Sequence, residues 1–159
     1  MRKLKIYLDT SVISHLDAPD VPDKMNDTLS LWEEIKQGLY DVVTSDIALR
    51  EIANCHEPKR SVLLDYLSEI DYERYSSTAE AESLANAIIG QGILTQKSLD
   101  DCLHIAIAVT NDCDMIISWN FKHMVNVRTI NGVRAVNLLN GYKSIDIYSP
   151  TILIKGDDN

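Results

Sequence analysis

Residues 5–16 read KIYLDTSVISHL, a short β-rich run that passes directly into a helical pattern. The run KIYL (5–8) is bounded by polar residues and has the continuous apolar character of a buried parallel strand. Asp9 follows it at once, and either Thr10 or Ser11 can cap the helix that continues through SVISHL. This step from strand to helix predicts an α/β fold with a carboxylate at the end of its first strand.

The same alternation continues along the chain. YDVVTS (40–45) and DMIIS (114–118) predict two further strands, and IDIYS (145–149) and TILI (151–154) are expected to add an edge strand. Helical patterns fill the gaps between these strands, and the first of them ends at the prolines of DAPDVPD (17–23). The later helices are expected at LSLWEEIKQ (29–37), SDIALREIANC (45–55), a segment opened by Pro58, TAEAESLANAIIGQG (78–92) and SLDDCLHIAIAVTND (98–112). The pattern predicts a three-layer sandwich, with a central, mostly parallel sheet flanked by helices.

Length and composition favour one soluble domain. The 159 residues are 45% hydrophobic and 25% charged, which is enough for one core, so we expect a single domain over 1–159 with residues from about 155 to 159 disordered. No stretch approaches the ~20 apolar residues of a membrane helix and no secretory signal opens the chain, so we expect a cytoplasmic protein without membrane contact. Three unpatterned cysteines predict reduced packing residues rather than disulfides or a zinc site.

The charge of the chain limits its partners. A net charge of −9 argues against general affinity for nucleic acids unless local cations or metal ions reverse the field. Lys122, His123, Arg128 and Arg134 follow the strand at 114–118 and could line one approach for a polyanion. Scattered basic residues are more often only solvated surface.

Two acids fall at informative positions of the predicted elements. Asp9 lies beyond the carboxyl end of the first strand, where the sites of such sheets form, although a single aspartate there also serves as a helix cap. Glu51 lies within the apolar arc of the helix at 45–55. Its simpler interpretation is a glutamate at the helix margin, whose carboxylate reaches water or an arginine.

The later motifs add a third acid and an amide. Asp101 borders the apolar face of the helix at 98–112, but periodicity does not choose between it and Asp100, and either also suits the helix dipole. His104 lies on the polar side of that helix, where we expect it to pair with Asp100. Asn120 follows the strand at 114–118 and offers its carbonyl to a cation or to a turn.

Taken in order, the segments YLDTSVIS, ALREI, LDDCLHIAIA and MIISWNFKHM resemble the motifs of the PIN domain, and among its members the VapC-type toxins and related small prokaryotic proteins. The resemblance covers residues 6 to about 125. It implies a metal-dependent endoribonuclease and maps the acidic residues of the family onto Asp9, Glu51 and Asp101. The fourth family position is often aspartate, whereas this chain has Asn120.

The resemblance also implies roles for the site. Asp9, Glu51 and Asp101 would hold Mg²⁺ or Mn²⁺, because these hard ions prefer oxygen ligands and a cation would offset the repulsion of grouped carboxylates. Asn120 would contribute an amide ligand or orient water. Thr10 or Ser11 could orient phosphate or water.

Weaker assignments and partners complete the expectation. Asp100 and Lys122 are weaker candidates beside the metal ligands. By the resemblance we expect RNA as substrate, an antitoxin as partner in a type II toxin–antitoxin pair, and a homodimer.

Three other functions compete with this hypothesis. A phosphatase of the haloacid dehalogenase type needs a second aspartate two residues after the first, where this chain has Ser11. A catalytically weak or inactive PIN module, acting by protein or RNA binding, is the stronger alternative because Asn120 removes one charge. A nuclease for DNA or structured flaps is the third.

Overall fold

The computed structural model describes residues 2–155. Of the tail for which we expect disorder, only Lys155 falls within that range, and its backbone N–H donates to Oε1 of Glu34 at 3.1 Å. Residues 156–159 lie outside the described residues.

Five parallel strands form one sheet in the order β3-β2-β1-β4-β5. They are β1 (Leu4–Leu8), β2 (Tyr40–Ser45), β3 (Glu73–Tyr75), β4 (Met115–Ile117) and β5 (Asp146–Tyr148). The predicted sheet is confirmed, and it is parallel throughout. Two details were wrong: β3 was not predicted, and residues 151–153 of the predicted edge segment lie in a short helix, α8 (Pro150–Leu153), because Pro150 suits a first helical turn better than a strand.

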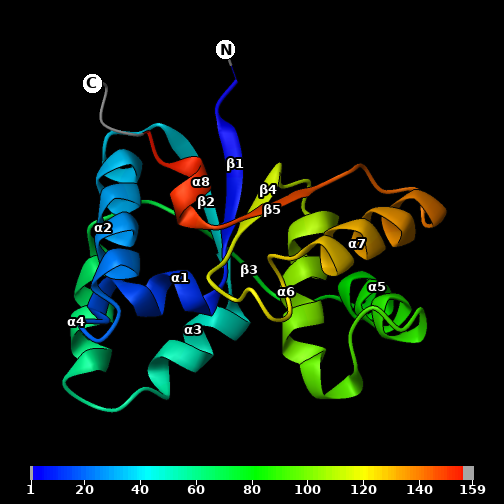
Figure 1. Ribbon diagram of the computed structural model, residues 1–159, viewed down its shortest axis with the longest axis horizontal. Helices are drawn as coiled ribbons and strands as arrows, with labels where there is room; N and C mark the ends of the chain where they lie inside the picture. Colours follow the sequence, from blue (N-terminus) through cyan, green and yellow to red (C-terminus); the bar gives the residue numbers. More distant parts are fainter. Residues whose placement is uncertain (1, 156–159) are drawn as a thin grey trace.

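Helices cover both faces of the sheet, which confirms the three-layer arrangement (Figure 1). One layer contains α1 (Thr10–Ser14), the 3-10 turn η1 (His15–Asp17), α2 (Pro22–Lys36), α3 (Asp46–Ala53), α4 (Lys59–Ser68) and α8. The other contains α5 (Ala79–Gly90), the 3-10 turn η2 (Gln96–Ser98), α6 (Leu99–Thr110) and α7 (Val127–Leu139). Helix α7 was not predicted from the sequence, and α2 begins seven residues before the predicted pattern at Leu29.

The central strand β1 divides the core into two clusters. Because successive side chains of a strand point to opposite faces, Tyr7 packs with α5, α6 and α7, while Ile6 and Leu8 pack with α1, α2, α3 and α4. In α2, Trp32 is fully buried against the sheet and its Nε1 donates to the carbonyl of Tyr66 at 3.1 Å. The apolar side of α2 is therefore used for packing against the sheet.

The cysteines also agree with the expectation from the sequence. Cys55, Cys102 and Cys113 are free thiols, and burial raises the pKa of Cys102 and Cys113 to about 12. No helix in the described part of the chain has the length and apolar character needed to cross a membrane.

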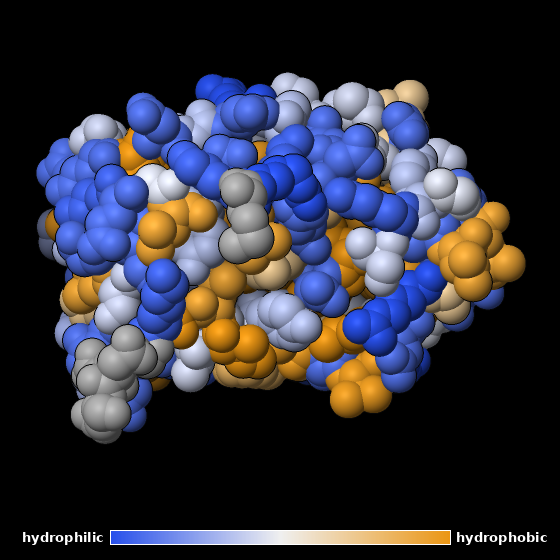
Figure 2. All heavy atoms as spheres, turned by 90° about the horizontal axis from the view of Figure 1, so that it is seen from above, coloured by the Kyte–Doolittle hydropathy of each residue, from blue (hydrophilic) through white to orange (hydrophobic). Residues whose placement is uncertain are grey.

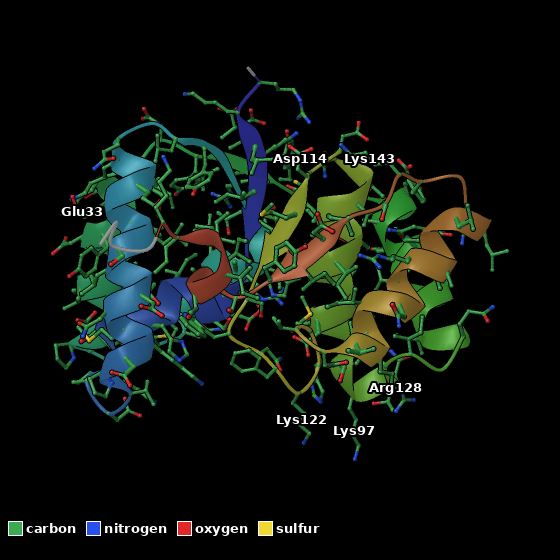
Figure 3. All side chains as sticks on the ribbon, turned by 45° about the horizontal axis from the view of Figure 1, so that its top comes forward. Glu33, Lys97, Asp114, Lys122, Arg128 and Lys143 are labelled. Atoms are coloured by element: carbon green, nitrogen blue, oxygen red, sulfur yellow. The ribbon has the colours of Figure 1, made fainter. Side chains whose placement is uncertain are left out.

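An ion cluster around Asp114 closes the amino edge of the sheet. Its carboxylate accepts from both terminal nitrogens of Arg2, at 2.9 and 3.0 Å, and from the backbone N–H of Lys5 at 2.8 Å, and Lys143 Nζ lies 3.5 Å away. Figure 3 shows Asp114 and Lys143 at this edge. The face at the amino ends of the strands is largely hydrophilic, with apolar groups between and at the margin (Figure 2).

Replacing Asp114 should destabilise the protein at neutral pH and less in acid. The hydrogen bond from Arg2 lowers the pKa of Asp114 to about 2, below the ~3.9 of an unfolded aspartate. Its contribution is therefore present above about pH 4 and is lost as the pH falls through about 2. We expect Asp114→Asn to cost about 1–2 kcal/mol at pH 7, measured by urea unfolding, and less at pH 2.5. Asp71→Asn, at an exposed position, is the matched control. If Asp114→Asn lost the same unfolding free energy relative to wild type at both pH values, the stabilising role of the ionised Asp114 would be contradicted.

Candidate functional site

A hollow of about 310 Å³ lies at the carboxyl edge of the sheet. Because all five strands are parallel, the segments that follow β1, β2 and β4 meet at this edge. The hollow is lined by Asp9, Thr10, Ser11, Ser14, His15, Glu51, Asp101, His104 and Asn120. Four predicted site residues, Asp9, Glu51, Asp101 and Asn120, thus line one space, as do the hydroxyl residues Thr10 and Ser11.

Asp9 is a buried carboxylate, only 4% exposed. It is the N-cap of α1, because Oδ1 accepts from the backbone N–H of Val12 at 3.2 Å. The prediction that Thr10 or Ser11 caps this helix was therefore wrong. The hydroxyl of Ser11 donates to Oδ1 and the hydroxyl of Ser118 donates to Oδ2. Burial raises the pKa of Asp9, while His104 and the two serine hydroxyls act in the opposite direction.

Glu51 reaches the hollow from α3. The N-cap of this helix is Ser45, whose side chain accepts from the backbone N–H of Ala48 at 3.3 Å. The carboxylate is partly exposed, and its Oε1 lies 3.3 Å from Nε2 of His104. That hydrogen bond is the main cause of a lowered pKa of Glu51, against a smaller effect of burial.

His104 corrects the prediction from helix periodicity. It is buried and does not pair with Asp100; its Nδ1 lies 2.6 Å from the hydroxyl of Tyr7, which in turn donates to Ser45 Oγ at 2.7 Å. Burial raises the pKa of Tyr7. A buried polar chain therefore runs from β2 through β1 to α6 and ends on Glu51.

The two neighbouring aspartates of α6 have different surroundings. Asp101 lines the hollow, and its Oδ2 lies 3.0 Å from Nδ1 of His123. Asp100 points to solvent and pairs at 3.7 Å with Arg50, so it does not line the hollow. The choice that periodicity left open is thus resolved in space: only Asp101 faces Asp9 and Glu51 across the hollow.

Asn120 is held by a turn. Its Oδ1 accepts from the backbone N–H of His123 at 2.9 Å, the turn bond that an asparagine after a strand commonly forms. The next residues lead away from the hollow, and Lys122 lines a neighbouring one. Trp119 is 6% exposed and donates to Thr28 Oγ1 at 2.9 Å, so it packs in the core, as its position after the strand favours.

Ser118 and His15 at the site were missed from the sequence, and a third residue was misassigned. Ser118 is fully buried at the end of β4 and holds Asp9, while His15 lines the hollow and its ring packs near that of Trp119. The third, His104, was seen but placed with the wrong partner. The position of Ser118 at the end of a strand was the one available signal.

The donor set fits a hard divalent ion by its chemistry. Three carboxylates and an amide carbonyl supply oxygen, which is what Mg²⁺ and Mn²⁺ prefer, and no cysteine lines the hollow. Within residues 2–155, however, no three acidic, histidine or cysteine side chains stand close enough to ligate one ion directly. An ion that retains several waters suits a hollow of this width better than a fully dehydrated one.

Comparison with solved structures supports the fold. The VapC20 toxin of Mycobacterium tuberculosis, which cleaves the sarcin–ricin loop, matches with a TM-score of 0.58 and 17% identity over 74% of this chain and 92% of its own. A VapBC2 structure from Rickettsia felis, bound to a DNA fragment from its promoter, matches with a TM-score of 0.56 and 15% identity over 92% of this chain and 98% of the other. No family model and no curated protein sequence matches the chain.

The fold is therefore an α/β fold of the PIN type. Within that class, the chain has the architecture of VapC toxins over most of its length. The resemblance seen in the sequence motifs is confirmed at the level of the fold.

Proposed function

We propose that this protein is a metal-dependent endoribonuclease that hydrolyses phosphodiester bonds of RNA. The observation that carries the proposal is that Asp9, Glu51 and Asp101, from three separate elements, line one hollow at the carboxyl edge of the sheet. The nuclease described by the VapC20 structure shares this fold, which supports the proposal.

The proposed roles follow from the contacts of each residue. Asp9, Glu51 and Asp101 would hold Mg²⁺ or Mn²⁺, in part through waters that the ion retains, and the ion would supply charge stabilisation at the phosphate and a water of lowered pKa. Ser11 and Ser118 hold the Asp9 carboxylate in one orientation, and His104 holds that of Glu51. Asn120 faces the same space, with its carbonyl already engaged by the turn.

Cleavage of RNA under controlled metal conditions tests the proposal. We expect purified protein to cleave a pool of structured RNAs with Mg²⁺ or Mn²⁺, to stop with EDTA, and to leave sequence-matched DNA intact. Asp101→Asn should lose the activity, because it removes one carboxylate while preserving its shape. Titration calorimetry with Mn²⁺ gives a readout that does not need cleavage.

Several results would reject the proposal. Cleavage that continues in EDTA or in Asp101→Asn would point to a contaminating nuclease. Equal cleavage of DNA and RNA would favour a nuclease that also acts on DNA. Absence of both cleavage and Mn²⁺ binding would favour a PIN module that binds without cleaving.

A PIN module that binds without cleaving is the second candidate. Two observations favour it: the carbonyl of Asn120 is used in a turn, and no three ligand side chains within residues 2–155 stand close enough for direct coordination. Binding of RNA without turnover at any metal concentration is the outcome that this function predicts.

We extend the proposal to the partners of the protein. The VapBC2 structure is of a paired system, and this supports a cognate antitoxin encoded beside this chain. We also propose a homodimer. Co-expression with the neighbouring small gene, followed by light scattering of the free protein and of any complex, tests both.

A further inference from the structure

A second hollow, of about 280 Å³, lies beside the first. Its walls come from the segment between α5 and α6 and from the segment between β4 and α7. We call it the basic hollow and define it by six of its lining residues: Gly92, Ser98, Lys122, His123, Asn126 and Arg128. It shares no lining residue with the carboxylate hollow, so it is a separate feature of the same edge.

The charge of this hollow is opposite to that of the chain. No aspartate or glutamate is among its lining residues, whereas Lys122 and Arg128 both line it. Within residues 2–155, neither Lys122 nor Arg128 forms an ion pair with a carboxylate, and the adjacent Lys97 forms none either. In a chain of net charge −9, three such cations at one place are a local reversal of the field.

The cations gather on the side of the molecule where the strands end. Figure 3 shows Lys97, Lys122 and Arg128 along one edge, opposite the edge that carries Asp114 and Lys143. Lys97 precedes Ser98 in η2, and Lys122 follows Phe121 in the segment after β4. Segments far apart in the sequence therefore supply this positive charge.

The walls of the hollow are held in place by specific contacts. Arg128 donates to the carbonyl of Gly92 at 3.0 Å, and Asn126 donates to the carbonyls of Phe121 and Lys122 at 2.9 and 3.0 Å. A Cβ at Gly132 of α7 would lie 2.6 Å from Cγ1 of Ile93, so glycine there permits α7 to pack directly on the segment that contains Gly92. The side chains of the hollow are thus carried by a fixed backbone, which favours binding.

His123 connects the two hollows. It lines the basic one, and its Nδ1 lies 3.0 Å from Oδ2 of Asp101, which lines the acidic one. Ser98, also a lining residue, lies 3.4 Å from the same nitrogen. The two hollows are therefore linked by a direct side-chain contact.

We propose that the basic hollow is a phosphate subsite that holds the RNA backbone beside the bond to be cleaved, with Lys122 and Arg128 as the main contacts and Lys97 at its mouth. The inference rests on the proposed function and names how that site binds its substrate. Its size, close to the lower limit of roughly 300 Å³ for ligand pockets, suits a phosphate and part of its sugar rather than a base pair. Cations spaced along one edge bind a polyanion without reading its sequence.

Binding of non-cleavable RNA tests the subsite apart from catalysis. Fluorescence anisotropy would measure the affinity for 2′-O-methyl single-stranded RNA in Mg²⁺. Wild type is compared with the double variant Lys122→Ala/Arg128→Ala. The control is Lys3→Ala/Lys155→Ala, which also removes two positive charges but at exposed lysines away from this hollow. We expect the first variant to bind about 25-fold more weakly near 0.1 M salt and its salt slope to fall by about 1.4, since each single-strand contact contributes about 0.7. The control and the charge-retaining Lys122→Arg/Arg128→Lys should remain within about threefold of wild type.

The possible outcomes distinguish the phosphate subsite from the nuclease activity on which it rests. Equal losses in the subsite variant and the control would show a general charge effect and overturn the subsite, as would an unchanged affinity or slope. Cleavage by wild type with a KM that the subsite variant leaves unchanged would overturn the subsite and keep the nuclease. Selective loss of binding in a protein that never cleaves would keep the subsite and overturn the nuclease, and wild type that neither binds nor cleaves would overturn both.

Discussion

Asp9→Asn is expected to lower kcat/KM for RNA by about 100- to 1000-fold, because it removes the most deeply buried charge of the site while keeping its shape. Burial raises the pKa of this carboxyl group, so its ionised form is costly to maintain, and a cation bound beside it would offset that cost. The amide can still accept from Val12 and Ser11, and the Ser118 hydroxyl can reverse its role to accept from it.

Two measurements separate lost chemistry from lost structure in this variant. The melting temperature of Asp9→Asn should stay within a few degrees of wild type, since replacing a buried charge by a neutral isostere does not leave an unpaired ion. Asp100→Asn, a neighbour of Asp101 that points to solvent, should keep wild-type activity. A fully active Asp9→Asn protein would remove the basis for the metal site.

His104→Ala is expected to have the second largest effect and to act on both activity and stability. Its imidazole joins Tyr7 to Glu51 in the buried chain at the end of the sheet. Without it, Glu51 loses its orienting partner, and we expect kcat/KM and Mn²⁺ affinity to fall by about 10- to 100-fold, the usual cost of removing a group that orients a metal ligand. The cavity and the loss of one of the two hydrogen bonds of the buried Tyr7 hydroxyl should also cost about 2–4 kcal/mol of folding free energy, measured by urea unfolding.

A conservative variant and a matched histidine test this role. His104→Gln keeps a hydrogen-bonding group and should recover part of the Mn²⁺ affinity. His15→Ala removes another histidine from the same hollow. The Nδ1 of His15 lies 2.7 Å from the backbone carbonyl of Ser11 and does not contact a carboxylate in that bond, so this variant should leave Mn²⁺ affinity nearly unchanged. Equal effects of His15→Ala and His104→Ala would contradict a specific role for His104 on Glu51.

Most of the sheet could be predicted because its strands are buried. The segments of β1 and β4 have a continuous apolar character, and that of β2 is a β-rich run bounded by polar residues, so their composition indicates strands. The edge strand β3 has only three residues, Glu73–Tyr75, largely outside the core, and nothing in its sequence distinguishes it from a loop. Two of the four buried residues of helix α7, Thr129 and Asn137, are polar and a glycine lies near its centre, which weakens the pattern that would have revealed it.

The candidate site was predictable in its acids but not in its partners. Asp9 and Asn120 lie directly after strands, and parallel strands bring such positions to one edge. The pairing of His104 was not predictable, because the helical wheel places it on the polar side of α6, whereas the fold brings Tyr7 of β1 and Glu51 of α3 against it. Periodicity describes one helix, whereas the burial of a polar residue depends on the neighbours that the whole fold brings to it.

The place of β1 in the sheet has a consequence for synthesis of the chain. Of the strands of this sheet, β1 is synthesised first, and it pairs on both sides; its residue Ile6 finds its partner Met115 only after β2, β3 and the helices up to α6 have been translated. Until then the nascent chain presents one apolar edge without a pairing strand, a form exposed to aggregation. The sheet can therefore be completed only after β4 and β5 have been translated, however early β1 emerges.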